Sequence, residues 1–183
     1  MPESAFRDYA ESKGFHPQTL KRWLDWPAAD RLALAELALA LKLGDNQLRD
    51  FMDWCEEIAL RDGVTMAALL MGKELDNIAT DPRLGRADRV KKIKEWLRRL
   101  RFPRLAQTED EVHGKIRALK LQPEIRLSVP PGLEGGRLEI HFSVTNQEDF
   151  KRLAKKLSAA ADSGASGEIF ALLGGAASSN ESA

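Results

Sequence analysis

The sequence contains one cysteine, Cys55, among its 183 residues. A single cysteine can form no intrachain disulfide and no cysteine-based zinc site, so both kinds of framework are excluded. The three histidines, His16, His113 and His141, fall in three separate predicted elements and have no carboxylate pair at ligand spacing beside them. The sequence therefore predicts no metal site, no cofactor and no catalytic centre, and an enzyme is the function class with least support.

Long apolar runs are also missing. No stretch is long enough to span a bilayer, and the N-terminus lacks the apolar core of a signal peptide. A glycine-rich phosphate loop is absent too, because Gly132, Gly135 and Gly136 lie in a predicted hairpin and not before a helix. We therefore expect no membrane partner and a cytoplasmic location, associated with the nucleoid if the protein binds DNA.

The formal net charge is zero, which by itself argues against nucleic-acid binding. The distribution of charge matters more than its sum. Residues 83–104 hold ten basic side chains against two acidic ones, whereas the predicted helix 45–62 has an acidic outer face. A solvated surface would explain the basic side chains, but their number favours contacts with phosphates. The candidates on one side of this predicted basic helix are Lys91, Lys94, Arg98 and Arg101.

Near the N-terminus the sequence predicts two short helices joined by a tight turn. Ala10, Gly14 and Leu20 have the spacing of a helix-turn-helix, which needs a small residue at the helix crossing and a glycine in the turn. Pro17 suits the first turn of the second helix, where its missing N–H is not needed. An ordinary helical hairpin has the same features, so both interpretations stay open. If the motif binds DNA, the residues that face outward to bases or phosphates are His16, Gln18, Thr19, Lys21 and Arg22.

Further apolar residues at three- and four-residue spacing predict helices as far as Thr80, so residues 1–80 are expected to form one helical domain. The Asp81-Pro82 step interrupts helix formation. Residues 81–104 are expected to form a basic connecting helix.

After the connecting helix the apolar period changes from helical to alternating, which is typical of half-buried strands. Residues 105–160 are therefore expected to fold as a small α-β-β-α domain, with Phe150 facing inward from its last helix. The fold class is thus mainly α, a helix-turn-helix domain followed by a small dimerisation domain. The tail 161–183 is small and polar, so we expect it to be mostly disordered apart from an apolar island at 169–173.

An isolated pair of strands is marginally stable, and its open edges favour pairing with another chain. Dimers are also common among helix-turn-helix proteins, which bind two half-sites. We therefore expect a homodimer formed through the C-terminal segment.

Residues 137–143 (RLEIHFS) and 146–153 (NQEDFKRL) resemble the terminal strand and helix of ParB-type chromosome and plasmid partition proteins. In outline the first 80 residues are similar to that family's central helix-turn-helix region. The resemblance implies a sheet shared between two chains and a lysine-rich face that binds DNA without sequence preference. The family's N-terminal nucleotide-binding domain has no counterpart in this sequence. The residues implied are Leu138, Ile140 and Phe142 for pairing, and Lys151, Lys155 and Lys156 for DNA.

These observations lead us to expect a dimeric protein that binds double-stranded DNA and acts as a partition-like or transcription-regulatory factor. The alternative is a protein–protein adaptor, in which the acidic helix 45–62 binds a partner and the basic segment is a solvated linker. The apolar island 169–173 has three open interpretations: it packs on the core of its own chain, it binds a protein partner, or it is a frayed helix. Salt dependence separates the two functions, because phosphate contacts weaken steeply as salt rises.

Overall fold

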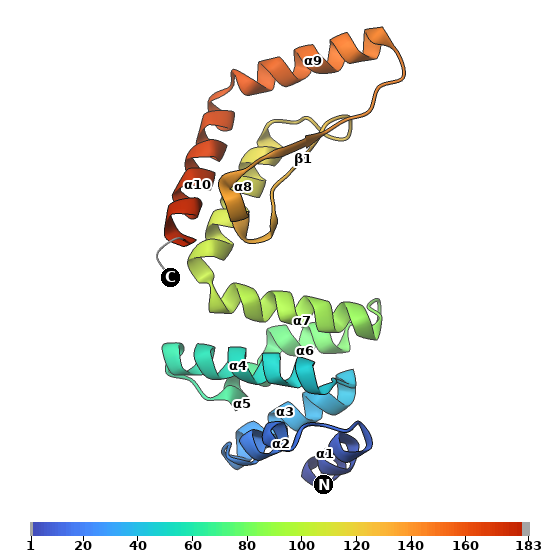
Figure 1. The fold of residues 1–183 in the computed structure, drawn as a ribbon, viewed down its shortest axis with the longest axis vertical. Coiled ribbons are helices and arrows are strands. Elements are labelled where there is room, and N and C mark those ends of the chain that lie inside the picture. The colour runs from blue at the N-terminus through green and yellow to red at the C-terminus, as the bar shows by residue number, and fades with distance from the viewer. Residues whose placement is uncertain (1, 181–183) are drawn as a thin grey trace. The chain divides into compact units, whose positions relative to one another are not determined.

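The computed structural model describes the backbone of residues 2–180 and the side chains of residues 3–174. It is mainly helical with one small antiparallel sheet, which confirms the predicted fold class at this level (Figure 1). The chain divides into two compact units, Met1–Phe102 and Pro103–Ala183. The basic segment predicted as a connector lies within the first unit, because its helix buries Val90, Ile93 and Leu97 in that unit's core.

The first unit consists of helices only. Gly14, in the predicted turn, and Gly63, at the end of α4, both have a φ of +65°, in the left-handed region that glycine enters without a Cβ clash. The helices are α1 (Pro2–Ser12), α2 (Pro17–Leu24), α3 (Ala28–Leu41), α4 (Asp45–Asp62), α5 (Met66–Leu70), α6 (Lys73–Thr80) and α7 (Arg86–Arg101).

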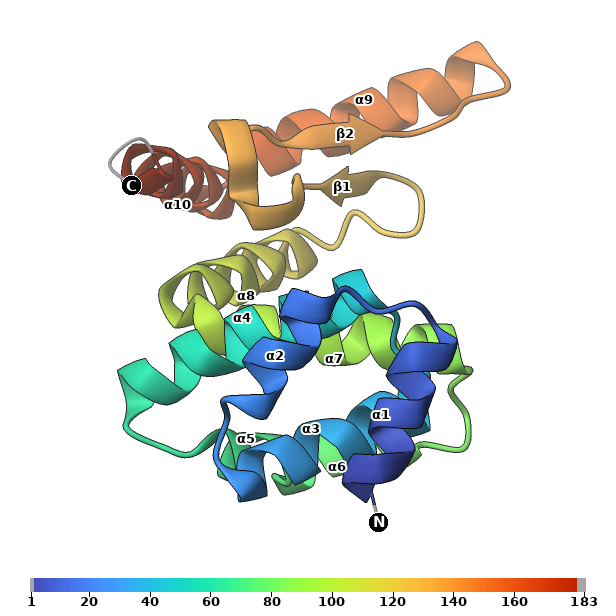
Figure 2. The same cartoon turned by 60° about the horizontal axis from the view of Figure 1, so that its bottom comes forward.

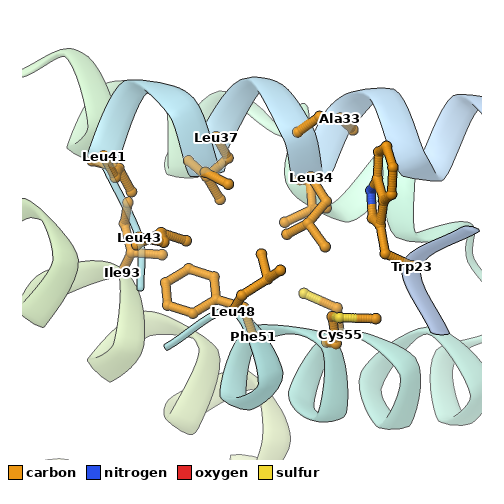
Figure 3. Close-up of a cluster of buried hydrophobic side chains, with 14 of the residues drawn as sticks. Trp23, Ala33, Leu34, Leu37, Leu41, Leu43, Leu48, Phe51, Cys55 and Ile93 are labelled. Carbon is orange, nitrogen blue, oxygen red and sulfur yellow. The ribbon is translucent and has the colours of Figure 1, made fainter. Parts of the chain in front are cut away.

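Helix α3 forms the centre of this unit. Its alanine- and leucine-rich sequence predicts burial on several sides, and half of its residues are buried. Figure 3 shows Leu34 and Leu37 of α3 facing Phe51 of α4, with Trp23 of α2 at one end of the cluster and Ile93 of α7 at the other. Each such side chain contributes about 1.5–3 kcal/mol when it leaves water. This core fixes α2, α4 and α7 around α3.

Cys55 lies within that core and is fully buried. Desolvation raises the pKa of its thiol to about 12, with a smaller contribution from the charge of Glu56. Because only the thiolate reacts with alkylating reagents, we expect iodoacetamide to leave Cys55 unmodified in the native protein and to modify it only where denaturant unfolds the first unit. Mass spectrometry after timed labelling measures this, with a cysteine placed at exposed Ser143 as the reactive control. Labelling of Cys55 at the control's rate without denaturant would show that α4 opens locally.

The second unit combines helices with a two-stranded sheet. Its elements are α8 (Pro103–Ala118), β1 (Arg126–Ser128), a 3₁₀ segment η1 (Pro131–Gly136), β2 (Glu139–His141), α9 (Gln147–Ala161) and α10 (Gly164–Asn180). Strands β1 and β2 pair antiparallel with Leu127 opposite Ile140, and Figure 2 shows them side by side. The hairpin loop is not a simple turn, because η1 places Leu133 in the core of this unit.

The expectation of a mostly disordered tail is not met between Gly164 and Asn180, where the chain forms α10. Ile169 and Leu173 of the apolar island are fully buried, against α8 and η1. They are four residues apart and therefore share one helical face. That face completes the second core, so the island has a partner within its own chain.

Candidate functional site

Three of the five predicted DNA-contacting residues in and next to α2 are exposed to solvent: His16, Gln18 and Lys21. His16 is the N-cap of α2, where its Nδ1 accepts a hydrogen bond of 3.2 Å from the backbone N–H of Gln18. The backbone N–H of His16 donates to the carboxylate of Asp45 over 3.2 Å. Pro17 lies in the first turn, as the sequence predicts. The turn between α1 and α2 is thus fixed to the start of α4.

Thr19 does not face outward as expected, because only 3% of its surface is exposed. It lies four residues before Trp23, which is fully buried. Residues four apart occupy the same face of a helix, so Thr19 is buried on the same face as Trp23. Thr19 cannot contact a base in this structure.

Arg22 faces the acidic side of α4. Its Nη1 lies 2.5 Å from Asp53, and its Nη2 and Nε lie 2.6 and 3.2 Å from the two carboxylate oxygens of Glu56. Glu56 also accepts a hydrogen bond of 2.7 Å from the indole of Trp26. The hydrogen bonds to Glu56 contribute most to raising the pKa of Arg22 above its ordinary value. To contact a base, Arg22 would therefore have to break its bidentate hydrogen bonds to Glu56 and its ion pair with Asp53.

The basic side of α7 also faces acidic residues of α4. Lys94 lies 2.6 Å from Asp50, and Arg101 lies 2.7 Å from Glu57. Both pairs join residues separated by the same 44 positions, so α4 and α7 run parallel with a constant offset. We call these two pairs the α4–α7 ladder. The two charged segments that the sequence suggested as separate surfaces therefore neutralise each other in part, at Lys94 and Arg101.

The remaining predicted contacts of α7 differ from one another. Arg98 pairs with Glu95 one turn earlier on its own helix, at 2.8 Å. Lys91 is exposed and forms no ion pair with the described side chains. Lys91 is thus the predicted residue of α7 that keeps an uncompensated charge.

Helix α9 carries the other predicted basic face. Lys151 and Lys155 are exposed and have no acidic partner among residues 3–174. Lys156 instead donates to Glu124 over 2.8 Å, and Arg152 bonds the same carboxylate. These hydrogen bonds hold the pKa of Glu124 below its usual range, and the bond from Lys156 contributes most. Two of the three predicted lysines therefore remain available for a ligand.

The outer edge of β2 has no strand beside it in the described part of the chain. Leu138 and Phe142, two of the predicted pairing residues, are half-buried against the second core. Ile140 between them is 43% exposed. Phe150 was expected to face inward but is 51% exposed, because α9 buries only Leu153. Three exposed apolar side chains thus follow one another from β2 to the start of α9: Ile140, Val144 and Phe150.

The comparisons identify no relative of this chain: it matches no protein-family model, no curated protein and no solved structure. Within residues 3–174 no group of three or more His, Cys, Asp or Glu side chains is arranged to hold a metal ion. Over the same described part, no helix has both the length and the apolar character that crossing a bilayer requires.

Proposed function

We propose that this protein is a homodimer that binds double-stranded DNA as a partition-like or transcription-regulatory factor, with residues 103–183 as its dimerisation unit. The observation that carries the proposal is the open edge of β2, where exposed Ile140 lies in the same segment as exposed Phe150 and the unpaired lysines of α9. An open edge with exposed apolar side chains pairs readily with another strand. The β2 edge of a second copy of the chain can supply that strand, and the resulting dimer has twofold symmetry.

The proposed dimer pairs β2 antiparallel with β2 of the second copy, with the twofold axis at Ile140. Glu139 then faces the partner subunit's His141, and Leu138 faces the partner subunit's Phe142. A register centred on Glu139 would instead place two carboxylates opposite each other, which is unfavourable for directly facing strand residues. The sequence Glu-Ile-His of β2 thus favours one register.

DNA binding in this proposal rests mainly on Lys151 and Lys155. They are one helical turn apart, so they point to one side of α9, and each is free to neutralise a phosphate. On α2 the exposed residues His16, Gln18 and Lys21 provide the helix-turn-helix contacts. The adaptor alternative has less support, because the acidic face of α4 that it requires is paired with α2 and α7.

Disulfide trapping tests the dimer and its register. In the proposed pairing the two residues at position 140 have Cβ atoms about 5 Å apart. Residues at position 143 would be roughly 20 Å from each other, since each lies three strand residues from the axis. We expect Ile140→Cys to form a covalent dimer under mild oxidation and Ser143→Cys to remain monomeric on a non-reducing gel. Cys55 adds no background because it is buried. Equal trapping at both positions would contradict the register, and no trapping at position 140 would contradict the dimer.

A further inference from the structure

Arg22 lies next to the residues of α2 that the proposed function assigns to DNA. It is four residues after the exposed Gln18, so the two side chains share one face of the helix. Lys21 is exposed beside it. A guanidinium at this position is suited to a phosphate, but that of Arg22 is held by Asp53 and Glu56 of α4.

This contact is more than a loose surface ion pair. The carboxylate of Glu56 accepts hydrogen bonds from both Nε and Nη2 of Arg22, a bidentate geometry that is stronger than a single charge contact. The indole of Trp26, which is buried, donates to the same carboxylate over 2.7 Å. Trp26 therefore fixes Glu56 in the position that faces Arg22.

Helix α2 is also fixed to α4 at its other end. There the backbone N–H of His16 donates to the carboxylate of Asp45 over 3.2 Å. Helix α2 can therefore move away from the acids of α4 only by breaking bonds at both of its ends.

A ligand can nevertheless reach the contact, because 36% of the Arg22 side chain and 38% of that of Glu56 are exposed. A phosphate that approaches Arg22 meets two carboxylates with charge of its own sign, both within hydrogen-bond distance of the guanidinium. Bringing like charges together is unfavourable at an interface. Asp53 and Glu56 thus occupy the donors of Arg22 and also repel the group that would replace them.

From these features we propose that Asp53 and Glu56 form an autoinhibitory contact, which keeps Arg22 from a DNA phosphate and lowers the affinity of α2 for DNA. This inference rests on the proposed DNA binding and adds a regulatory element to it. Neutralising the two carboxylates, or pairing them with cations of another molecule, would release the guanidinium. The contact lies wholly within the first unit, so it acts independently of the proposed dimer and of the lysines of α9.

The double variant Asp53→Asn, Glu56→Gln tests the contact in the full-length protein, by fluorescence anisotropy on a labelled random duplex. Both substitutions keep the side-chain shape, and the new amide oxygen at position 56 can still accept the indole N–H of Trp26. We expect the variant to bind at least about tenfold more tightly, the size of one hydrogen bond to a charged group. The slope of log affinity against log salt should steepen by about one unit per subunit, because Arg22 then neutralises one phosphate.

Two further variants separate the release of Arg22 from a change in net charge. Glu36→Gln with Asp76→Asn removes the same charge from exposed positions of α3 and α6, and should change the affinity by less than about twofold because distant charges are screened. Adding Arg22→Gln to the double variant should return the slope to that of the unsubstituted protein and remove the gain in affinity. A triple variant that kept the gain would show that lost repulsion causes it, and would overturn the proposal.

The autoinhibitory contact and the proposed function fail in different ways. If the double variant binds the duplex no more tightly than the Glu36 and Asp76 control, the contact is not autoinhibitory, while DNA binding stands. If neither the unsubstituted protein nor any variant binds at low ionic strength, both proposals are wrong. Binding by the double variant alone, lost again with Arg22→Gln, would support the contact in its strongest form.

Discussion

Replacing Ile140 with aspartate should convert the proposed dimer into a monomer. In the register centred on this residue, the two new carboxylates would face each other across the twofold axis. Burying an unpaired charge costs about 3 kcal/mol or more, and two copies cost about 6 kcal/mol, or roughly four orders of magnitude in the dimer dissociation constant. Sedimentation equilibrium over a concentration series measures the change. Ile140 is 43% exposed in the single chain, so the fold of the second unit should persist.

Leu60→Asp is the matched control for this prediction. Leu60 is an exposed leucine of the first unit, with 87% of its surface accessible, and the substitution adds the same charge outside the proposed interface. The control should keep the dissociation constant of the unsubstituted protein. Circular dichroism verifies that both variants retain their helices. A folded Ile140→Asp variant that remained dimeric would show that the β2 edge is not the interface.

The charge pattern shows how far sequence reasoning reaches in this protein. The sequence correctly predicts that α4 has an acidic face and that α7 has a basic one. Asp50 and Glu57 are seven residues apart, and so are Lys94 and Arg101. The sequence alone therefore contains the matched spacing of the two acids and the two cations. Pairing them requires knowing that α4 and α7 pack side by side and run parallel. That is a tertiary fact, which no local pattern contains.

Burial on short elements was harder to predict than the helices themselves. The spacing of Leu20 and Trp23 predicts that Thr19 faces outward, yet Thr19 is buried on the same face as Trp23 one turn later. The helical spacing of Phe150, Leu153 and Leu157 predicts that Phe150 faces inward, yet α9 has too little of the second unit against it to cover that ring. The island around Ile169 was apolar enough to be noticed, but its docking on α8 depended on a partner face far away in sequence. In each case the neighbouring elements decide which side chains are buried.

The salt dependence of DNA binding should be set by α9 and not by α7. Each phosphate neutralised by a lysine releases counterions and contributes about −0.9 to the slope of log affinity against log salt. Lys151 and Lys155 have no acidic partner in the described chain, so replacing both with glutamine should flatten the slope by about two units per subunit, or about four in the dimer. Fluorescence anisotropy on a labelled random duplex over a salt series measures it.

Two double variants make this prediction decisive. Lys94 and Arg98 already pair with Asp50 and Glu95, so their replacement by glutamine should leave the slope nearly unchanged, because their counterions were released when the chain folded. Lys73→Gln with Lys92→Gln removes the same charge from exposed positions of the first unit and should also leave it unchanged. Flattening by the Lys94 and Arg98 pair alone would move the phosphate contacts to α7, as the sequence first suggested. If no duplex binds even at low ionic strength, DNA is not a partner of this protein.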